Sequence, residues 1–110
     1  AQPCLSLRIE LHDKAIFYSG DGRPTPMTQE LADGCDIIIH EAYGFEDTTL
    51  GHGSIGSCLT FACNAGVTLL ALVHMQRDIR LQSKTAIKGL ADKYAEIEIL
   101  LPENGSRIVL

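Results

Sequence analysis

The stretch GVTLLALVHMQRD, residues 66–78, decides the fold of this chain. Its apolar run from Val67 to Val73 is rich in branched side chains and follows a glycine, which is typical of a strand buried on both faces. The run stops at His74. Because the loops after the C-terminal ends of parallel strands open onto the crevice where α/β proteins bind ligands, His74 is the first candidate site residue. A histidine that only caps the strand is an equally good interpretation of this stretch alone.

A hairpin is predicted at the N-terminus, with a strand of alternating apolar and polar residues at 5–11 and a second arm at 15–19. The second arm runs directly into Gly20-Asp21-Gly22. Glycines on both sides allow a close approach to the Asp21 carboxylate, which would suit a metal ligand. The alternative is an ordinary turn aspartate.

A second strand with a polar end is predicted at residues 36–41, DIIIHE, after a short helix that begins at Thr25-Pro26 and stops at Gly34. Side chains alternate along a strand, so His40 and Glu41 point to opposite faces and only one of them faces a site. We expect Glu41 to be that residue. The alternative is a surface residue at the strand exit.

The polar, glycine-containing stretch 43–53 predicts a loop. This loop carries His52 just before a predicted helix at residues 54–65. That helix has Ile55, Leu59, Ala62 and Cys63 at helical spacing. The free amides and dipole of a helix N-terminus favour anions, which suits a histidine that handles a phosphate or carboxylate. A solvent-exposed loop histidine is the alternative.

The remaining pattern predicts an amphipathic helix at residues 83–95 and short strands at 96–101 and 107–110. The fold class is therefore α/β, with a mixed sheet and two main helices, 54–65 and 83–95, on one face. The strands at 36–41 and 67–73 are apolar on both faces, so the other face of the sheet needs a cover as well.

Composition limits the function classes. A chain of 110 residues with 45% apolar and 21% charged residues is the size and type of one globular domain. A net charge of -5 argues against a broad, sequence-independent grip on nucleic acid. No apolar run approaches 18 residues, and the first residues lack a signal-peptide pattern. Cys4, Cys35, Cys58 and Cys63 form no CxxC pair, and the last three lie in apolar settings typical of buried thiols, so we expect a soluble cytoplasmic protein.

Four short motifs, SGDGRP, IIHEAY, GHGS and LVHMQRD, follow one another in the order found in the C-terminal half of the metallo-beta-lactamase superfamily. The chain resembles most closely the ribonuclease Z and phosphodiesterase-like branch. The resemblance implies that residues 1–110 are a single segment, half of an αββα sandwich. It also implies a metal-dependent hydrolase that cleaves a phosphodiester or another ester with metal-activated water. The expected cofactor is a divalent metal, two Zn ions, with Mn or Fe as alternatives.

The resemblance also assigns roles to the candidate residues. Asp21 corresponds to the aspartate that bridges two metal ions, and His74 to a metal ligand. Glu41 and His52 correspond to residues implicated in proton transfer to the leaving group. The family loop commonly reads His-Ser-Thr, whereas this chain has His52-Gly53-Ser54, so the small hydroxyl is displaced.

The HxHxDH motif of the family's N-terminal half is absent from these 110 residues, and so is a further histidine ligand. Asp21 and His74 alone are two ligands where zinc generally takes three or four from protein. We therefore expect a partner, either the missing N-terminal half or a second copy in a homo-oligomer, and a small-molecule or nucleotide-type ester as substrate, with no membrane involved. The alternative is a non-catalytic, truncated binding or assembly module. A thiol redox domain would need paired cysteines.

Overall fold

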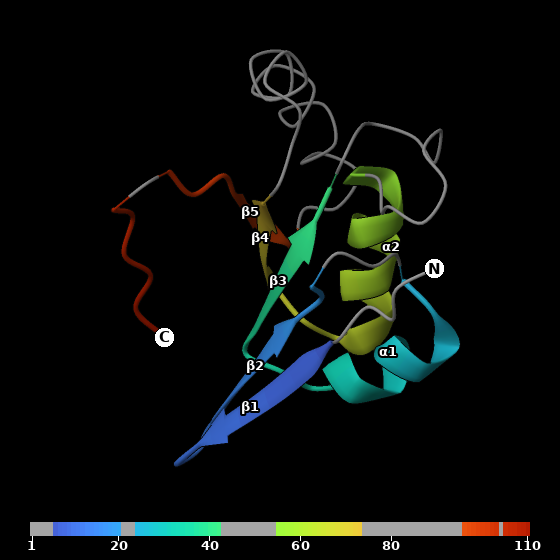
Figure 1. Ribbon diagram of the computed structural model, residues 1–110. Helices are drawn as coiled ribbons and strands as arrows, with labels where there is room; N and C mark the ends of the chain where they lie inside the picture. Colours follow the sequence, from blue (N-terminus) through green and yellow to red (C-terminus); the bar gives the residue numbers. More distant parts are fainter. Residues whose placement is uncertain (1–5, 21–23, 43–54, 74–95, 104) are drawn as a thin grey trace.

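The structure is a computed structural model that describes residues 6–20, 24–42, 55–73, 96–103 and 105–110. These residues form one five-stranded mixed sheet with two helices on one of its faces (Figure 1). The strands lie in the sheet in the same order as in the sequence: β1 (Leu7–Leu11), β2 (Lys14–Tyr18), β3 (Ile37–Glu41), β4 (Leu69–Val73) and β5 (Glu98–Leu100). β1 and β2 are antiparallel, and every pair from β2 to β5 is parallel. The predicted α/β class, with a mixed sheet, is confirmed.

The predicted hairpin is the antiparallel pair of β1 and β2, closed by a two-residue turn at His12 and Asp13. His12 has a φ of 57°, in the left-handed region that a tight hairpin turn requires. At the same end of the sheet, the Asp36 carboxylate accepts a hydrogen bond from the Ala15 N–H at 2.7 Å. The Asp36 N–H donates in turn to the Ala15 carbonyl at 2.8 Å. This pair of bonds sets where β3 begins beside β2.

Both described helices begin or end as the sequence predicts. α1 (Pro26–Ala32) has Thr25 as its N-cap, with a reciprocal capping box between Thr25 and Thr28. α2 (Ile55–Ala65) ends before Gly66, which has a φ of 69°. Because only glycine adopts this left-handed conformation without strain, Gly66 stops the helix and turns the chain into β4. The second predicted helix, at residues 83–95, lies outside the described residues.

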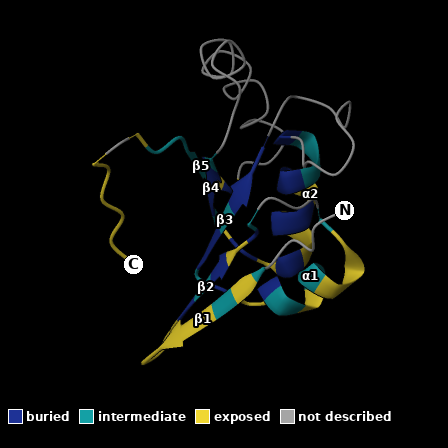
Figure 2. Ribbon diagram, viewed as in Figure 1, coloured by how far each residue is buried: buried dark blue, intermediate teal, exposed yellow. Residues whose placement is uncertain are grey.

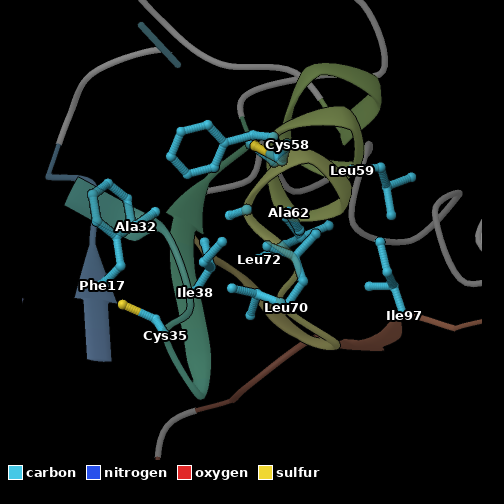
Figure 3. Close-up of a cluster of buried hydrophobic side chains, with 14 of the residues drawn as sticks. Phe17, Ala32, Cys35, Ile38, Cys58, Leu59, Ala62, Leu70, Leu72 and Ile97 are labelled. Atoms are coloured by element: carbon cyan, nitrogen blue, oxygen red, sulfur yellow. The ribbon is translucent and has the colours of Figure 1, made fainter. Parts of the chain in front are cut away.

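The hydrophobic core lies between the sheet and the two helices (Figure 3). Phe17, Ile38, Leu70 and Leu72 project from β2, β3 and β4 towards the helices. Their partners on the helices are Ala32 of α1 and, on α2, Ile55, Cys58, Leu59, Phe61, Ala62 and Ala65. One face of the sheet is therefore sealed, and the polar strand ends sit at the rim of this core.

Two predictions are wrong. Cys63 is exposed, although Cys35 and Cys58 are buried as predicted, because α2 turns the Cys58, Leu59 and Ala62 side towards the sheet. Residues 107–110 form no strand. After the turn in which the Ser106 N–H donates to the Glu103 carbonyl at 2.9 Å, this segment leaves the edge of β5 and finds no ladder partner among the described residues.

The face of the sheet opposite the helices, which we call the open face, is incompletely covered, and β1 is mostly exposed (Figure 2). Arg8 marks the helix side of β1, because its guanidinium donates to the Leu31 and Asp33 carbonyls at 2.9 and 2.8 Å. Its neighbours along the strand therefore point the other way. The open face includes the buried Ile37 and Ala71 and the exposed Leu7, Ile9, Leu11 and Tyr18. The exposed fractions of Leu7, Ile9 and Leu11 are 41%, 47% and 65%, so the apolar side of β1 has no cover in this part of the chain.

The C-terminal segment 105–110 runs along the same side (Figure 1). It borders a cleft of about 340 Å³ against Leu69 and Leu100 and another of about 440 Å³ against Leu11 and Ile16. Val109 remains 85% exposed, so the segment does not seal the open face. Neither described helix has the length and apolar character that crossing a membrane would require.

Candidate active site at the carboxyl edge of the sheet

Three parallel strands end side by side at one edge of the sheet. β3 lies between β2 and β4, with Tyr18 opposite Ile39 and Val73 opposite Glu41. The Ala42 N–H continues the ladder by donating to the Val73 carbonyl at 3.0 Å. The chain therefore leaves β2 and β4 on either side of the end of β3. Carboxyl ends of adjacent parallel strands are the usual position of a site in an α/β sheet.

Glu41 ends β3 and is only 1% exposed, so the alternative of a surface glutamate at the strand exit is wrong. Its backbone is held by three side chains. The Glu41 N–H donates to the Ser19 Oγ at 3.0 Å, beside the end of β2. The Glu41 carbonyl lies 2.9 Å from the His40 Nδ1 and accepts from the Cys58 Sγ of α2 at 3.2 Å. This residue is therefore placed rigidly at the edge of the core.

His40 and Glu41 point to opposite faces of the sheet, as the strand alternation predicts. The His40 ring packs on the helix side, with its centroid 5.3 Å from the Phe61 ring and 6.2 Å from the Phe17 ring. Because a carbonyl can only accept, the Nδ1 that faces the Glu41 carbonyl carries the proton. Burial lowers the pKa of His40, and the bond to the Glu41 carbonyl opposes this change only in part. His40 is thus a neutral core histidine.

Ser19 is a buried polar residue that the sequence analysis did not single out. It follows β2 directly, is 1% exposed, and its hydroxyl connects two strand ends. The Oγ accepts from the Glu41 N–H at 3.0 Å and donates to the Gly20 carbonyl at 2.9 Å. The signal that could have found it is a small polar residue at the end of an apolar strand, AIFYS, immediately before the GDG sequence.

The other predicted site residues, Asp21, His52 and His74, lie outside the described residues. Within residues 6–20, 24–42, 55–73, 96–103 and 105–110, no three His, Cys, Asp or Glu side chains are close enough to hold a metal ion. The described residues next to Asp21 and His74 are placed as a shared site would require. Gly20, after the end of β2, directly precedes Asp21, and Val73, the last residue of β4, directly precedes His74. β2 and β4 lie on either side of β3. A carboxylate and an imidazole are suitable zinc ligands, although a complete site needs more of them.

The lowered pKa of His40 predicts a loss of stability in mild acid. Below the ordinary histidine pKa of 6.5, the unfolded chain binds a proton that the buried ring does not, so the free energy of unfolding should decrease as the pH falls from 7 to 5. Urea unfolding of the protein completed by its N-terminal half, at several pH values, measures this. In His40→Phe the decrease should be smaller, whereas His12→Asn, in the exposed hairpin turn, should behave like the wild type. Identical pH profiles for His40→Phe and the wild type would contradict the assignment.

Comparison of the sequence with curated proteins finds ribonuclease Z proteins from several organisms. Ribonuclease Z of Brevibacillus brevis is 32% identical over 94 residues, which are 81% of this chain and 29% of that protein. Ribonuclease Z of Ignicoccus hospitalis is 31% identical over 88 residues, covering 73% of this chain and 29% of the relative. The chain thus spans less than a third of the length of these curated relatives. No protein-family model matches it.

Solved structures agree with the fold. The metallo-beta-lactamase fold protein YhfI from Bacillus subtilis superposes with a TM-score of 0.70 at 20% identity, covering 92% of this chain and 42% of that one. The short form of human tRNase Z superposes with a TM-score of 0.54 at 23% identity, covering 82% of this chain and 31% of that one. The matching sequences and this mixed sheet lead to one conclusion: the chain belongs to the metallo-beta-lactamase superfamily and is ribonuclease Z-like.

Proposed function

We propose that this chain supplies the C-terminal half of the active site of a metal-dependent hydrolase that cleaves phosphodiester or other ester bonds. The observation that carries the proposal is the parallel order of β2, β3 and β4, which puts the exits towards Asp21 and His74 on either side of Glu41. Glu41 and the strand ends that precede Asp21 and His74 are far apart in the sequence but lie at one edge of the sheet, which is where α/β proteins place their sites. The ribonuclease Z relatives support a hydrolase.

In this proposal Asp21 and His74 hold a divalent metal, with two zinc ions as the expected complement and manganese or iron as alternatives. The metal, when bound, activates water for attack on the ester. Asp21 would provide carboxylate oxygens and His74 one imidazole nitrogen. The remaining ligands would come from the N-terminal half of the fold, since zinc sites that catalyse hydrolysis generally take three ligands from the protein.

Glu41 and His52 are proposed to move the proton to the leaving group. Glu41 is suited to this role by its place, since its backbone is bonded to Ser19 and Cys58 and its residue is almost wholly buried. A general acid must stand at a defined position relative to the leaving oxygen, and a buried, anchored residue meets that requirement. The sequence resemblance is the support for His52.

The open face supports the proposal of a second half. Leu7, Ile9 and Leu11 present a row of exposed apolar side chains along β1, and soluble proteins rarely leave large apolar patches uncovered. In a sandwich, this face packs on a second sheet. We propose that the cover is the N-terminal half of the fold, with a second copy of the chain as the alternative. The short span of the chain relative to its curated relatives agrees with a missing half.

Elemental analysis of alanine variants tests the metal assignment. In the protein completed by its N-terminal half, Asp21→Ala and His74→Ala should each lower the bound metal, because each removes a ligand. Asp13→Ala, in the exposed turn at the opposite end of β2, is the matched control and should keep the full metal content. If both site variants bind as much metal as the control, the metal assignment is wrong. A protein that assembles but binds no metal would favour the non-catalytic binding or assembly module.

A further inference from the structure

We propose that Ser19 is a positioning residue of the metal site, whose hydroxyl holds the segment that enters Asp21 against the strand that ends in Glu41. The inference rests on the function proposed above and extends it to a residue that touches neither substrate nor metal. It concerns a connection between two strand ends, and all of its contacts are made by described residues.

The hydroxyl of Ser19 uses both of its hydrogen-bonding roles. Its oxygen accepts from the Glu41 N–H at 3.0 Å, and its proton is donated to the Gly20 carbonyl at 2.9 Å. A serine hydroxyl has one proton to give, so the direction of each bond is settled by its partner. The side chain is thus a two-ended link between the exit of β2 and the last residue of β3.

The link lies where the regular strand pairing stops. The Ser19 N–H still donates to the Ile39 carbonyl at 3.0 Å, which is the last backbone bond between β2 and β3 among the residues that the structure describes. Gly20 then takes a φ of 65°, so the chain turns out of the strand conformation. From there the hydroxyl bond to the Gly20 carbonyl orients the peptide group that leads into Asp21. Ladder and hydroxyl together therefore define where the Asp21 segment starts.

Packing alone does not explain a serine at this position. Ser19 is as buried as the apolar residues around it, and a buried hydroxyl is unfavourable unless its hydrogen bonds are needed. An alanine would leave the buried Glu41 N–H without its acceptor. Groups that orient a metal ligand from behind typically change metal affinity by 10- to 100-fold when they are removed.

Two variants of the same shape test the role of the hydroxyl. Ser19→Thr keeps it and Ser19→Val replaces it with a methyl group, so their difference isolates the hydrogen bonds. In the protein completed by its N-terminal half, Ser19→Val should bind zinc roughly 10- to 100-fold more weakly than Ser19→Thr in a chelator competition. The absorption spectrum of the cobalt-substituted protein should change in Ser19→Val and stay like the wild type in Ser19→Thr.

Two controls separate positioning from general destabilisation. Ser6→Ala removes a hydroxyl that bonds to the Ser19 carbonyl at 2.9 Å but does not reach Glu41 or Gly20. Ile97→Val weakens the core beside β5, far from the strand ends in question. Both should keep wild-type zinc affinity and cobalt spectrum. Equal affinities in Ser19→Val and Ser19→Thr would overturn the role of Ser19.

A further variant and a measurement on the wild type complete the test. If Asp21→Ala binds zinc normally, the proposed function itself fails. If Asp21→Ala loses zinc binding while Ser19→Val binds zinc normally, only the role of Ser19 is rejected. Hydrogen exchange of the wild type requires no variant to fold. Zinc should slow exchange of the Glu41 amide more than that of the Glu98 amide, which bonds to the Thr68 carbonyl elsewhere in the sheet. Equal slowing of both amides would also overturn the proposal.

Discussion

The 110-residue chain, purified alone, should self-associate or aggregate and should show no metal-dependent hydrolysis. Both results have a structural reason. The open face exposes Leu7, Ile9 and Leu11 in a row, and apolar surface of this kind is removed from water by association. Activity should be absent because two candidate ligands are too few for a catalytic zinc site. Light scattering and an assay with an activated phosphodiester measure the two properties.

Co-expression of an N-terminal half that carries an HxHxDH motif should restore both solubility and divalent-metal-dependent activity. The matched variants are Ile9→Lys and Met27→Lys. The first places a charge on the open face and should prevent complementation, while the second changes an apolar residue that is already 82% exposed on α1 and should leave it intact. A monomeric chain that hydrolyses the substrate fully without any partner would refute the proposal of a second half.

The second large effect is expected at His52. His52→Ala should reduce turnover by roughly a hundredfold or more, the size usual for the loss of a general acid, while the metal content stays unchanged. The loss should be largest for substrates with poor leaving groups, such as alkyl esters, because they need protonation as the bond breaks. Nitrophenyl esters, whose leaving group is stable without a proton, should lose much less.

Glu41→Gln should follow the same leaving-group pattern, because Glu41 is proposed to act in the same proton transfer. Gln keeps the size of the side chain and removes only its ability to carry a proton, which limits disturbance of this buried position. His12→Asn, in the exposed hairpin turn, is the control and should retain wild-type turnover. An equal loss for good and poor leaving groups in His52→Ala would argue against a role as general acid.

The substrate class and the location of the protein are further predictions. The net charge of -5 still argues against a broad electrostatic grip on nucleic acid by this chain, but a second half could contribute a basic surface. Assays of the completed protein with phosphodiester, RNA and lactone substrates would distinguish these three substrate classes. A cytoplasmic location also stays a prediction.

Local sequence patterns determined most of the secondary structure. The apolar runs at β3 and β4 predicted buried strands because both faces of a central parallel strand are covered by side chains or neighbours. Thr25-Pro26 and Gly66 predicted the beginning of α1 and the end of α2, since capping and positive φ depend on the residue itself. The order of the motifs identified the superfamily, and the comparisons confirm it.

Only the tertiary structure decided which side chains are buried and which distant residues come into contact. Cys58 and Cys63 both lie in the apolar sequence of α2, yet the packing of α2 on the sheet buries Cys58 and leaves Cys63 exposed. Residues 107–110 have strand-like composition, but after the turn at Glu103 and Ser106 the chain leaves the edge of β5, and these residues pair with no described strand. The link from Ser19 to Glu41 joins residues 22 positions apart, so it depends on the parallel register of β2 and β3, which local sequence patterns do not encode.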